Sequence, residues 1–146
     1  MSDQADLLSE AALTVYRLNG QFLNLGDALA RPAELTVAWW QVLSAVEAEP
    51  MSVAAIARLR GLTRQGVQRT ADLLVDKGLA EYAVNPAHRR AKLLRPTPEG
   101  LAAIAQIEPG LTAAAERVMA VLGPGGLEEV IAALKRLSAT LDRLTG

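Results

Sequence analysis

Residues 52–77, SVAAIARLRGLTRQGVQRTADLLVDK, decide the fold. Ser52 and Thr63 each precede a run with helical apolar spacing, and their side-chain oxygens suit the N-cap position of a helix. Gly61 separates the two runs and suits a tight turn that ends the first one. The segment therefore predicts two short helices, Ser52–Leu59 and Thr63–Lys77. This is the helix-turn-helix arrangement, in which the second helix enters the major groove of DNA.

The second of these helices has two distinct faces. One is apolar at helical spacing, and we expect it to point inward: Val67, Ala71, Leu74 and Val75. The opposite face is polar: Arg64, Gln65, Gln68, Arg69 and Asp72. Arginine can form two hydrogen bonds with guanine, and glutamine two with adenine. We therefore expect base or phosphate contacts from Thr63, Arg64, Gln65 and Gln68, and a phosphate contact from Arg69.

A short hairpin is predicted directly after this unit. Gly78 suits the left-handed position that closes the second helix, with Leu79 able to contact Leu74. The stretches AEYAV (80–84) and KLLR (92–95) are strand candidates on either side of the turn-like NPAHRRA (85–91). The loop and its exit carry His88, Arg89, Arg90 and Lys92. Beside a recognition helix such a hairpin is a wing, whose arginine can enter an A·T-rich minor groove. The competing interpretation is a solvated turn that only needs polar residues.

The charge distribution favours the wing. The chain has a net charge of -1, but residues 58–95 contain nine cations and three acids, a net charge of +6. The remaining residues carry six cations and thirteen acids, a net charge of -7. A basic middle between acidic ends indicates a polyanionic partner for the middle. Charge alone would also fit a chance cluster on a solvated surface.

Composition limits the other classes of protein. With 146 residues, 51% of them hydrophobic and 3% aromatic, the chain can build one aliphatic, largely helical domain. The absence of cysteine excludes disulfides and cysteine-type zinc sites. Neither a long apolar run nor a basic leader is present, so we expect a cytoplasmic protein.

Helices are predicted on both sides of the central unit. Apolar residues at helical spacing indicate a helix over 7–29, ended by Arg31-Pro32. Thr36 and Thr97 are further N-cap candidates, and Pro98 fits the first turn after Thr97. In the helix that follows, Pro109-Gly110 predicts a kink or a break, and GPGG (123–126) predicts a stop. The last segment has a stripe at heptad-like spacing: Leu127, Val130, Ile131, Leu134, Leu137, Leu141 and Leu144.

Residues 52–100 resemble the winged helix of the multiple-antibiotic-resistance regulator (MarR) family. The stretches LVDKGL (74–79) and HRRAKLLRPTPEG (88–100) carry the resemblance most specifically. It implies a mainly helical fold with a small β-hairpin wing, a winged helix-turn-helix lobe over 35–97, and a dimerisation region formed by 1–34 and 98–146. It also implies an obligate homodimer that binds a pseudo-palindromic operator in double-stranded DNA. The implied activity is transcription control, most often repression relieved by a small-molecule effector.

Two positions depart from the pattern of this family. His88 stands two residues before Arg90, where an aspartate is usual, so Arg90 would be held differently or share its role with Arg89. His88 itself could contact DNA, be a plain solvated side chain, or act as a pH switch. Pro96 stands where leucine is usual, and because it lacks a backbone donor we expect it to shorten the second strand.

An effector site is implied by the resemblance alone. In the resembled family, effectors lie between the dimerisation helices and the DNA-binding lobe. The resemblance makes Tyr16, Phe22, Trp39 and Trp40 candidates for that pocket. Core packing is the favoured interpretation for each of them, because aromatic side chains are mostly packing residues.

Two other functions compete with a DNA-binding regulator. A winged helix could instead use its basic face to bind an acidic protein partner, without reading a DNA sequence. A small helical enzyme is the other alternative, but we find no convincing pair of catalytic acids, nucleophile elbow, phosphate loop or dinucleotide motif. We therefore expect no enzymatic activity, no cofactor and no metal.

Overall fold

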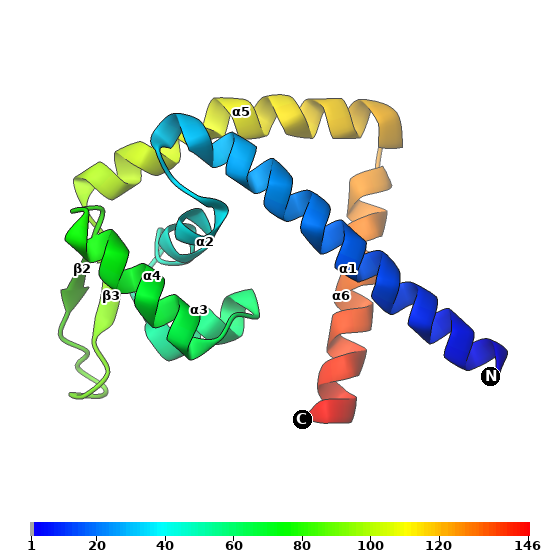
Figure 1. The fold of residues 1–146 in the computed structure, drawn as a ribbon, viewed down its shortest axis with the longest axis horizontal. Helices are drawn as coiled ribbons and strands as arrows, with labels where there is room; N and C mark the ends of the chain where they lie inside the picture. Colours follow the sequence, from blue (N-terminus) through cyan, green and yellow to red (C-terminus); the bar gives the residue numbers. More distant parts are fainter. Residues whose placement is uncertain (1) are drawn as a thin grey trace. The chain divides into compact units, whose positions relative to one another are not determined.

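The computed structural model describes residues 2–146 and is mainly helical with one small sheet (Figure 1). The predicted fold class is therefore confirmed. The chain divides into two compact units, one ending at Glu108 and the other spanning Pro109–Gly146. The elements are, in chain order, α1 (Asp3–Ala30), the 3₁₀ helix η1 (Arg31–Ala33), α2 (Val37–Ala45), β1 (Met51–Ser52), α3 (Val53–Arg60), α4 (Arg64–Asp76), β2 (Ala80–Ala83), β3 (Leu93–Pro96), α5 (Pro98–Leu122) and α6 (Gly126–Thr145).

The four predicted N-caps are all formed. In each case the backbone N–H three residues further along donates to the cap oxygen over 3.0–3.2 Å, at Thr36, Ser52, Thr63 and Thr97. These bonds satisfy donors that the first turn of a helix leaves free. Helix α2 has a second cap, because Val37 N donates to Asp27 Oδ1 of α1 over 2.8 Å. The caps therefore fix where α2, α3, α4 and α5 begin.

The core of the first unit is aliphatic. Its largest fully buried side chains include Leu43 of α2, Ile56 of α3, Leu74 of α4 and Leu94 of β3. Four elements thus meet at a single apolar centre, as the inward face predicted for α4 requires. Trp39 and Trp40 are half-buried and pack against this core.

The sheet has three antiparallel strands in the order β1-β3-β2. The sequence predicts β2 and β3 but not β1, which is only two residues long and pairs Met51 with Leu94. Pro96 is the last residue of β3, opposite Ala80, so the expected shortening of this strand is wrong. The next residue, Thr97, donates its N–H to Leu79 O over 3.1 Å. Since donors alternate along a strand, the position of Pro96 needs no donor toward β2.

Two outer helices differ in length from their predictions. Helix α1 extends from Asp3 to Ala30, beyond the predicted 7–29 at both ends. Helix α5 runs continuously through Pro109, so a break there is wrong. Proline removes one backbone donor, and the turns on either side still hold the helix together. The predicted stop is confirmed, because Gly123 and Gly125 adopt positive φ angles of +79° and +76° before α6 begins.

Among residues 2–146, no helix combines the length and the apolar character needed to cross a lipid bilayer.

Candidate nucleic-acid interface

The turn before α4 is built by two short-range bonds. Gly61 has a φ of +67°, a left-handed conformation that favours glycine, and Leu62 N donates to Ala57 O over 2.9 Å. Thr63 then caps α4 by accepting from Gly66 N. A Cβ at Gly66 would lie 3.0 Å from Thr63 Oγ1, closer than most Cβ contacts. Gly66 therefore fits closely against the cap.

Helix α4 has the two faces that the sequence predicts. Val67, Ala71 and Leu74 are buried against the core. The side chains expected to contact DNA are all exposed: Arg64, Gln65, Gln68 and Arg69. The β2–β3 hairpin lies beside this helix (Figure 1). The arrangement presents a polar helical face next to a basic loop.

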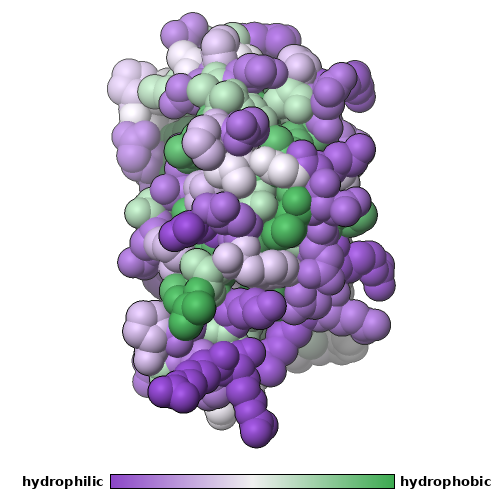
Figure 2. Space-filling view, turned by 90° about the vertical axis from the view of Figure 1, so that its left-hand side faces the viewer, coloured by the Kyte–Doolittle hydropathy of each residue, from purple (hydrophilic) through white to green (hydrophobic). Residues whose placement is uncertain are grey.

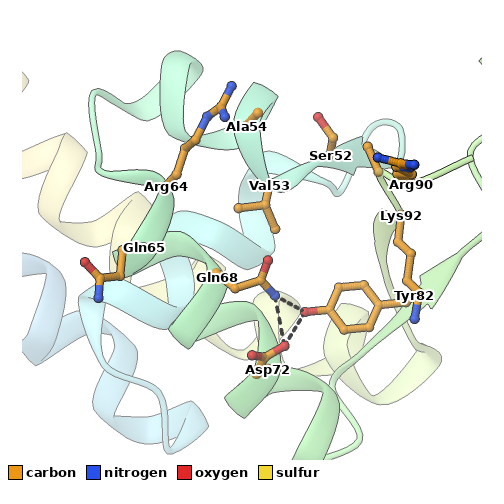
Figure 3. A pocket seen from close by; sticks show the side chains of 11 residues that line it. Ser52, Val53, Ala54, Arg64, Gln65, Gln68, Asp72, Tyr82, Arg90 and Lys92 are labelled. Atoms are coloured by element: carbon orange, nitrogen blue, oxygen red, sulfur yellow. Dashed lines mark hydrogen bonds between the residues drawn. The ribbon is translucent and has the colours of Figure 1, made fainter. Parts of the chain in front are cut away.

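A network of three polar side chains joins α4 to β2 (Figure 3). Tyr82 Oη donates to Asp72 Oδ1 over 2.6 Å. Gln68 Nε2 donates to the same carboxylate oxygen and to Tyr82 Oη, each over 3.0 Å. Sequence reasoning placed Gln68 among the DNA contacts and Asp72 on the polar face, but it missed Tyr82. The network fixes the recognition helix to the base of the wing.

Tyr82 stays protonated throughout the working range of pH. Burial, together with the hydrogen bond to Asp72 and its negative charge, raises the pKa of Tyr82 to about 12. Its hydroxyl therefore remains a donor to Asp72 in any ordinary buffer. The ammonium of Lys92 lies 5.7 Å from the centre of the Tyr82 ring, within range of a cation–π contact.

An open hollow of about 560 Å³ lies between α4, the start of α3 and the wing (Figure 3). Its wall includes Arg64 and Gln65 from the recognition helix and Arg90 and Lys92 from the wing. Five of the nine predicted contact residues therefore line this hollow, since Gln68 is among them. Cations from both elements line it, so it suits a negatively charged ligand such as a phosphate backbone.

The tip of the wing is an exposed turn. Asn85 Oδ1 accepts from Ala87 N over 3.0 Å, and His88 N donates to Asn85 O over 3.2 Å. His88, Arg89 and Arg90 are all exposed. The surface on the side that carries the hairpin is mostly hydrophilic, with hydrophobic residues in small separate patches (Figure 2).

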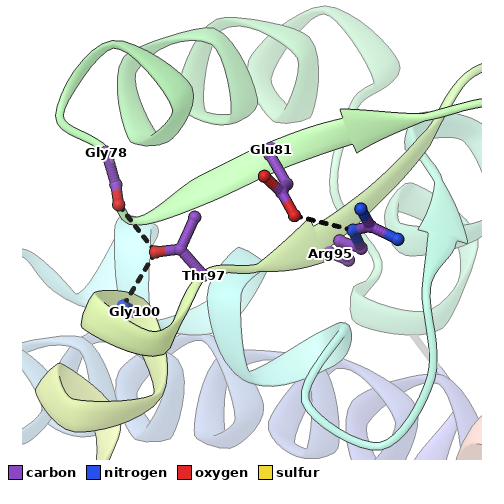
Figure 4. Close-up of polar contacts among 5 residues, drawn as sticks. All are labelled: Gly78, Glu81, Arg95, Thr97 and Gly100. Carbon is purple, nitrogen blue, oxygen red and sulfur yellow. Dashed lines mark hydrogen bonds and ion pairs between the residues drawn. The ribbon is translucent and has the colours of Figure 1, made fainter.

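Two cations of the basic residues 58–95 bond to other groups of the protein. Arg95 forms an ion pair with Glu81 across the two strands of the wing, with Nε and Oε1 2.8 Å apart (Figure 4). Arg60 donates from Nε to Gln41 O over 3.2 Å and from Nη2 to Ser44 Oγ over 3.3 Å. Arg60 thus links α3 to α2, Arg95 links the two strands of the wing, and both are less free to meet DNA.

The base of the wing is joined tightly to α5 (Figure 4). Gly78 closes α4 with a φ of +76°, and Leu79 N donates to Leu74 O over 2.9 Å, as predicted. Thr97 Oγ1 donates to Gly78 O over 2.6 Å and accepts from Gly100 N over 3.1 Å. A Cβ at Gly100 would overlap the carbonyl oxygen of Leu79. Glycine at position 100 therefore permits the close approach of α5 to the wing.

Comparison with known proteins shows the family of the chain. The sequence model described as MarR family matches residues 33–91, which include α2, α3, α4 and β2. Uncharacterized protein Rv2011c of Mycobacterium tuberculosis is 34% identical over 137 residues, covering 94% of this chain and 96% of that protein. The chain belongs to the MarR family.

Solved structures of MarR regulators share the fold. A mutant MarR from E. coli, complexed with operator DNA, superposes with a TM-score of 0.79 at 20% identity, covering 93% of this chain and 99% of that one. BpsR of Bordetella bronchiseptica, whose DNA binding is regulated by 6-hydroxynicotinic acid, gives a TM-score of 0.76 at 19% identity, covering 88% and 98%. This MarR-family chain thus has the winged-helix fold of DNA-binding transcription regulators.

The four effector-pocket candidates of this MarR-family protein lie in two different environments. Tyr16 and Phe22 project from α1 and are 69% and 58% exposed. Trp39 and Trp40 belong to α2 and pack against the core of the lobe. The tryptophans thus take the packing role that the sequence favours, whereas Tyr16 and Phe22 remain mostly exposed among residues 2–146.

Proposed function

We propose that this MarR-family protein is a homodimeric, sequence-specific DNA-binding regulator that represses transcription until a small molecule releases it. Residues 35–97 form the DNA-binding lobe, and residues 1–34 and 98–146 form the dimerisation region. Helix α4 enters the major groove through Thr63, Arg64, Gln65 and Gln68, with Arg69 on a phosphate. The wing contacts the flanking DNA through His88, Arg89, Arg90 and Lys92.

One observation carries this proposal. Arg64 and Gln65 of the exposed helical face line the same hollow as Arg90 and Lys92 of the wing. A duplex that meets α4 in its major groove would bring its phosphates to this hollow, where cations on two sides stabilise them. A wing arginine next to the helix can then reach an adjacent minor groove.

The proposed dimer would bury apolar surface that the single chain leaves exposed. Helix α6 has no buried residue, and its apolar stripe includes Val130, Ile131, Leu134 and Leu141. Exposed stripes of this kind are typical of association surfaces. In a homodimer with two-fold symmetry, the two recognition helices would lie about 34 Å apart to meet successive turns of a pseudo-palindromic operator.

The effector is proposed by analogy with the relative that 6-hydroxynicotinic acid regulates. A ligand near Tyr16, Phe22, Trp39 or Trp40 would favour one of two dimer geometries and so change the spacing of the recognition helices. The expected result is that a bound ligand weakens operator affinity. Affinity that stays constant across a broad set of small aromatic acids would remove this part of the proposal.

Selection of bound duplexes from random DNA tests the central claim. We expect a pseudo-palindromic motif for the native protein. Arg64→Ala should relax individual base positions inside the motif, while Arg90→Ala should weaken the preference for A·T pairs that flank it. Val84→Ala, on the exposed start of the wing loop, serves as the control and should select the native motif.

A different outcome would favour the competing function. Binding that is weak, falls steeply with salt and yields no motif would show that the lobe does not read sequence. The basic face would then be a surface for an acidic protein partner.

A further inference from the structure

The side-chain amide of Gln68 is already occupied in the structure. Its nitrogen carries two hydrogens, and both are donated within the protein, one to Asp72 Oδ1 and one to Tyr82 Oη. Only the carbonyl oxygen Oε1 remains for an outside partner. In Figure 3 this oxygen points away from Asp72 and Tyr82. Gln68 therefore presents an acceptor at the recognition surface and keeps its donors for the protein.

The orientation of this amide follows from its two neighbours. An ionised Asp72 has no hydrogen to donate, so it requires a donor from Gln68. Tyr82 uses its single hydroxyl hydrogen in the 2.6 Å bond to Asp72, so it too can only accept from Gln68. Turning the amide over would set Gln68 Oε1 against two acceptors. The network thus has one consistent arrangement of hydrogens.

Tyr82 is held in place independently of Gln68. Tyr82 lies within β2 and pairs with Leu94 of β3, which is fully buried in the core. The ammonium of Lys92 lies over its ring. The bond from Gln68 to the Asp72 carboxylate is charge-assisted and therefore stronger than a bond between neutral groups. A base that accepts from the nitrogen of Gln68 would have to displace its hydrogen bond to Asp72 or to Tyr82.

We propose that Tyr82 and Asp72 are positioning residues that restrict Gln68 to one acceptor contact, so that it selects a base with an amino group in the major groove. Adenine and cytosine present such a group, whereas guanine and thymine present acceptors at the corresponding edge. To distinguish adenine from cytosine, Gln68 would need to donate to N7 of adenine as well as accept from N6. This inference rests on the proposed function, because it concerns how the lobe reads DNA.

The experiment has two steps, both with the full-length protein and defined duplexes. Selection from random DNA with native protein and with Gln68→Ala first identifies the base position that only Gln68→Ala relaxes. Affinities are then measured for the four bases at that position, with native protein and with Tyr82→Phe. The phenylalanine ring keeps the packing and removes only the hydroxyl. Thermal melting and circular dichroism verify that each variant is folded.

We expect native protein to bind adenine and cytosine within about threefold of each other, and both at least about fivefold tighter than guanine and thymine. Tyr82→Phe frees one hydrogen of Gln68, so adenine should gain over cytosine by about fivefold or more at this position. Base positions read by Arg64 should keep their native preferences in Tyr82→Phe, which is the internal control. This pattern would separate positioning from a general loosening of the wing.

Three results would overturn the inference while leaving a DNA-reading protein in place. These are a native preference for adenine over cytosine of fivefold or more, a Gln68→Ala variant that relaxes no position, and a Tyr82→Phe variant that weakens all sequences equally. Selection of no motif by the native protein is a distinct result, because it would overturn the proposed function itself.

Discussion

The winged-helix lobe buries its apolar side chains within the chain, whereas the terminal helices leave many of theirs exposed. In the lobe, Leu43, Ile56, Leu74 and Leu94 come from four different elements and are fully buried by their own chain. Helix α6 has no buried residue, although its apolar stripe is long and regular. Helix α1 spans 28 residues, about 42 Å at 1.5 Å per residue, and exposes Leu7, Leu8, Leu13 and Phe22.

This difference separates two sources of stability. The lobe obtains the free energy of burial inside one chain, so its fold depends on side chains packed against each other. The terminal helices leave apolar side chains exposed, and in the proposed homodimer a second copy of the chain would bury them. Substitutions in the lobe should therefore affect unfolding, whereas substitutions on the stripe of α6 should affect association.

The largest effect is expected in the core of the lobe. Leu74→Ala should lower the free energy of unfolding by about 2–5 kcal/mol, because it leaves a cavity where α4 meets the core. Urea denaturation at fixed protein concentration measures the change. The neighbouring Leu73 is 42% exposed, so Leu73→Ala is the matched control and should cost much less. Equal costs for the two variants would contradict the inward face assigned to α4.

The next effect is expected on α6. Leu134→Asp should weaken dimerisation by about 30-fold or more, since it places a charge in an apolar interface. Sedimentation equilibrium across a range of concentrations measures the dissociation constant. Ala132→Asp adds the same charge two residues earlier, about 200° around the helix, and should leave the dimer intact. A native protein that sediments as a monomer, or a Leu134→Asp variant that still dimerises normally, would argue against this role for α6.

The comparison also explains which parts of the fold the sequence predicts. N-caps, glycine turns and the faces of α4 depend on residues within a few positions of each other, so local spacing predicts them correctly. Strand β1 was not predicted, because two residues carry too little pattern and the pairing of Met51 with Leu94 spans a large stretch of chain. Pro109-Gly110 predicts a kink or a break, and the break is wrong, since the surrounding turns keep α5 helical.

At the candidate site, too, local spacing does not reveal contacts between residues far apart in the chain. The exposed face of α4 and the basic tip of the wing follow from residue type and helical period. Tyr82 does not, because its contacts with Gln68 and Asp72 join residues 14 and 10 positions apart through the tertiary fold. For the same reason Arg95, counted among the basic residues, could not be recognised as the ion-pair partner of Glu81. Spacing identifies the surface, and the fold decides which of its side chains are free.

The smallest effect is expected at that ion pair, which sharpens the contrast between the core and the surface of the lobe. Glu81 and Arg95 are 51% and 52% exposed, so water screens their attraction and their coupling should be about 0.2–1 kcal/mol. A double-mutant cycle with Glu81→Ala and Arg95→Ala, followed by urea denaturation, measures this coupling free energy. It should decrease further at high salt, because exposed charges are screened within a few ångströms there. A coupling comparable to the cost of Leu74→Ala would mean that surface charge stabilises the paired strands of the wing as strongly as apolar packing stabilises the core.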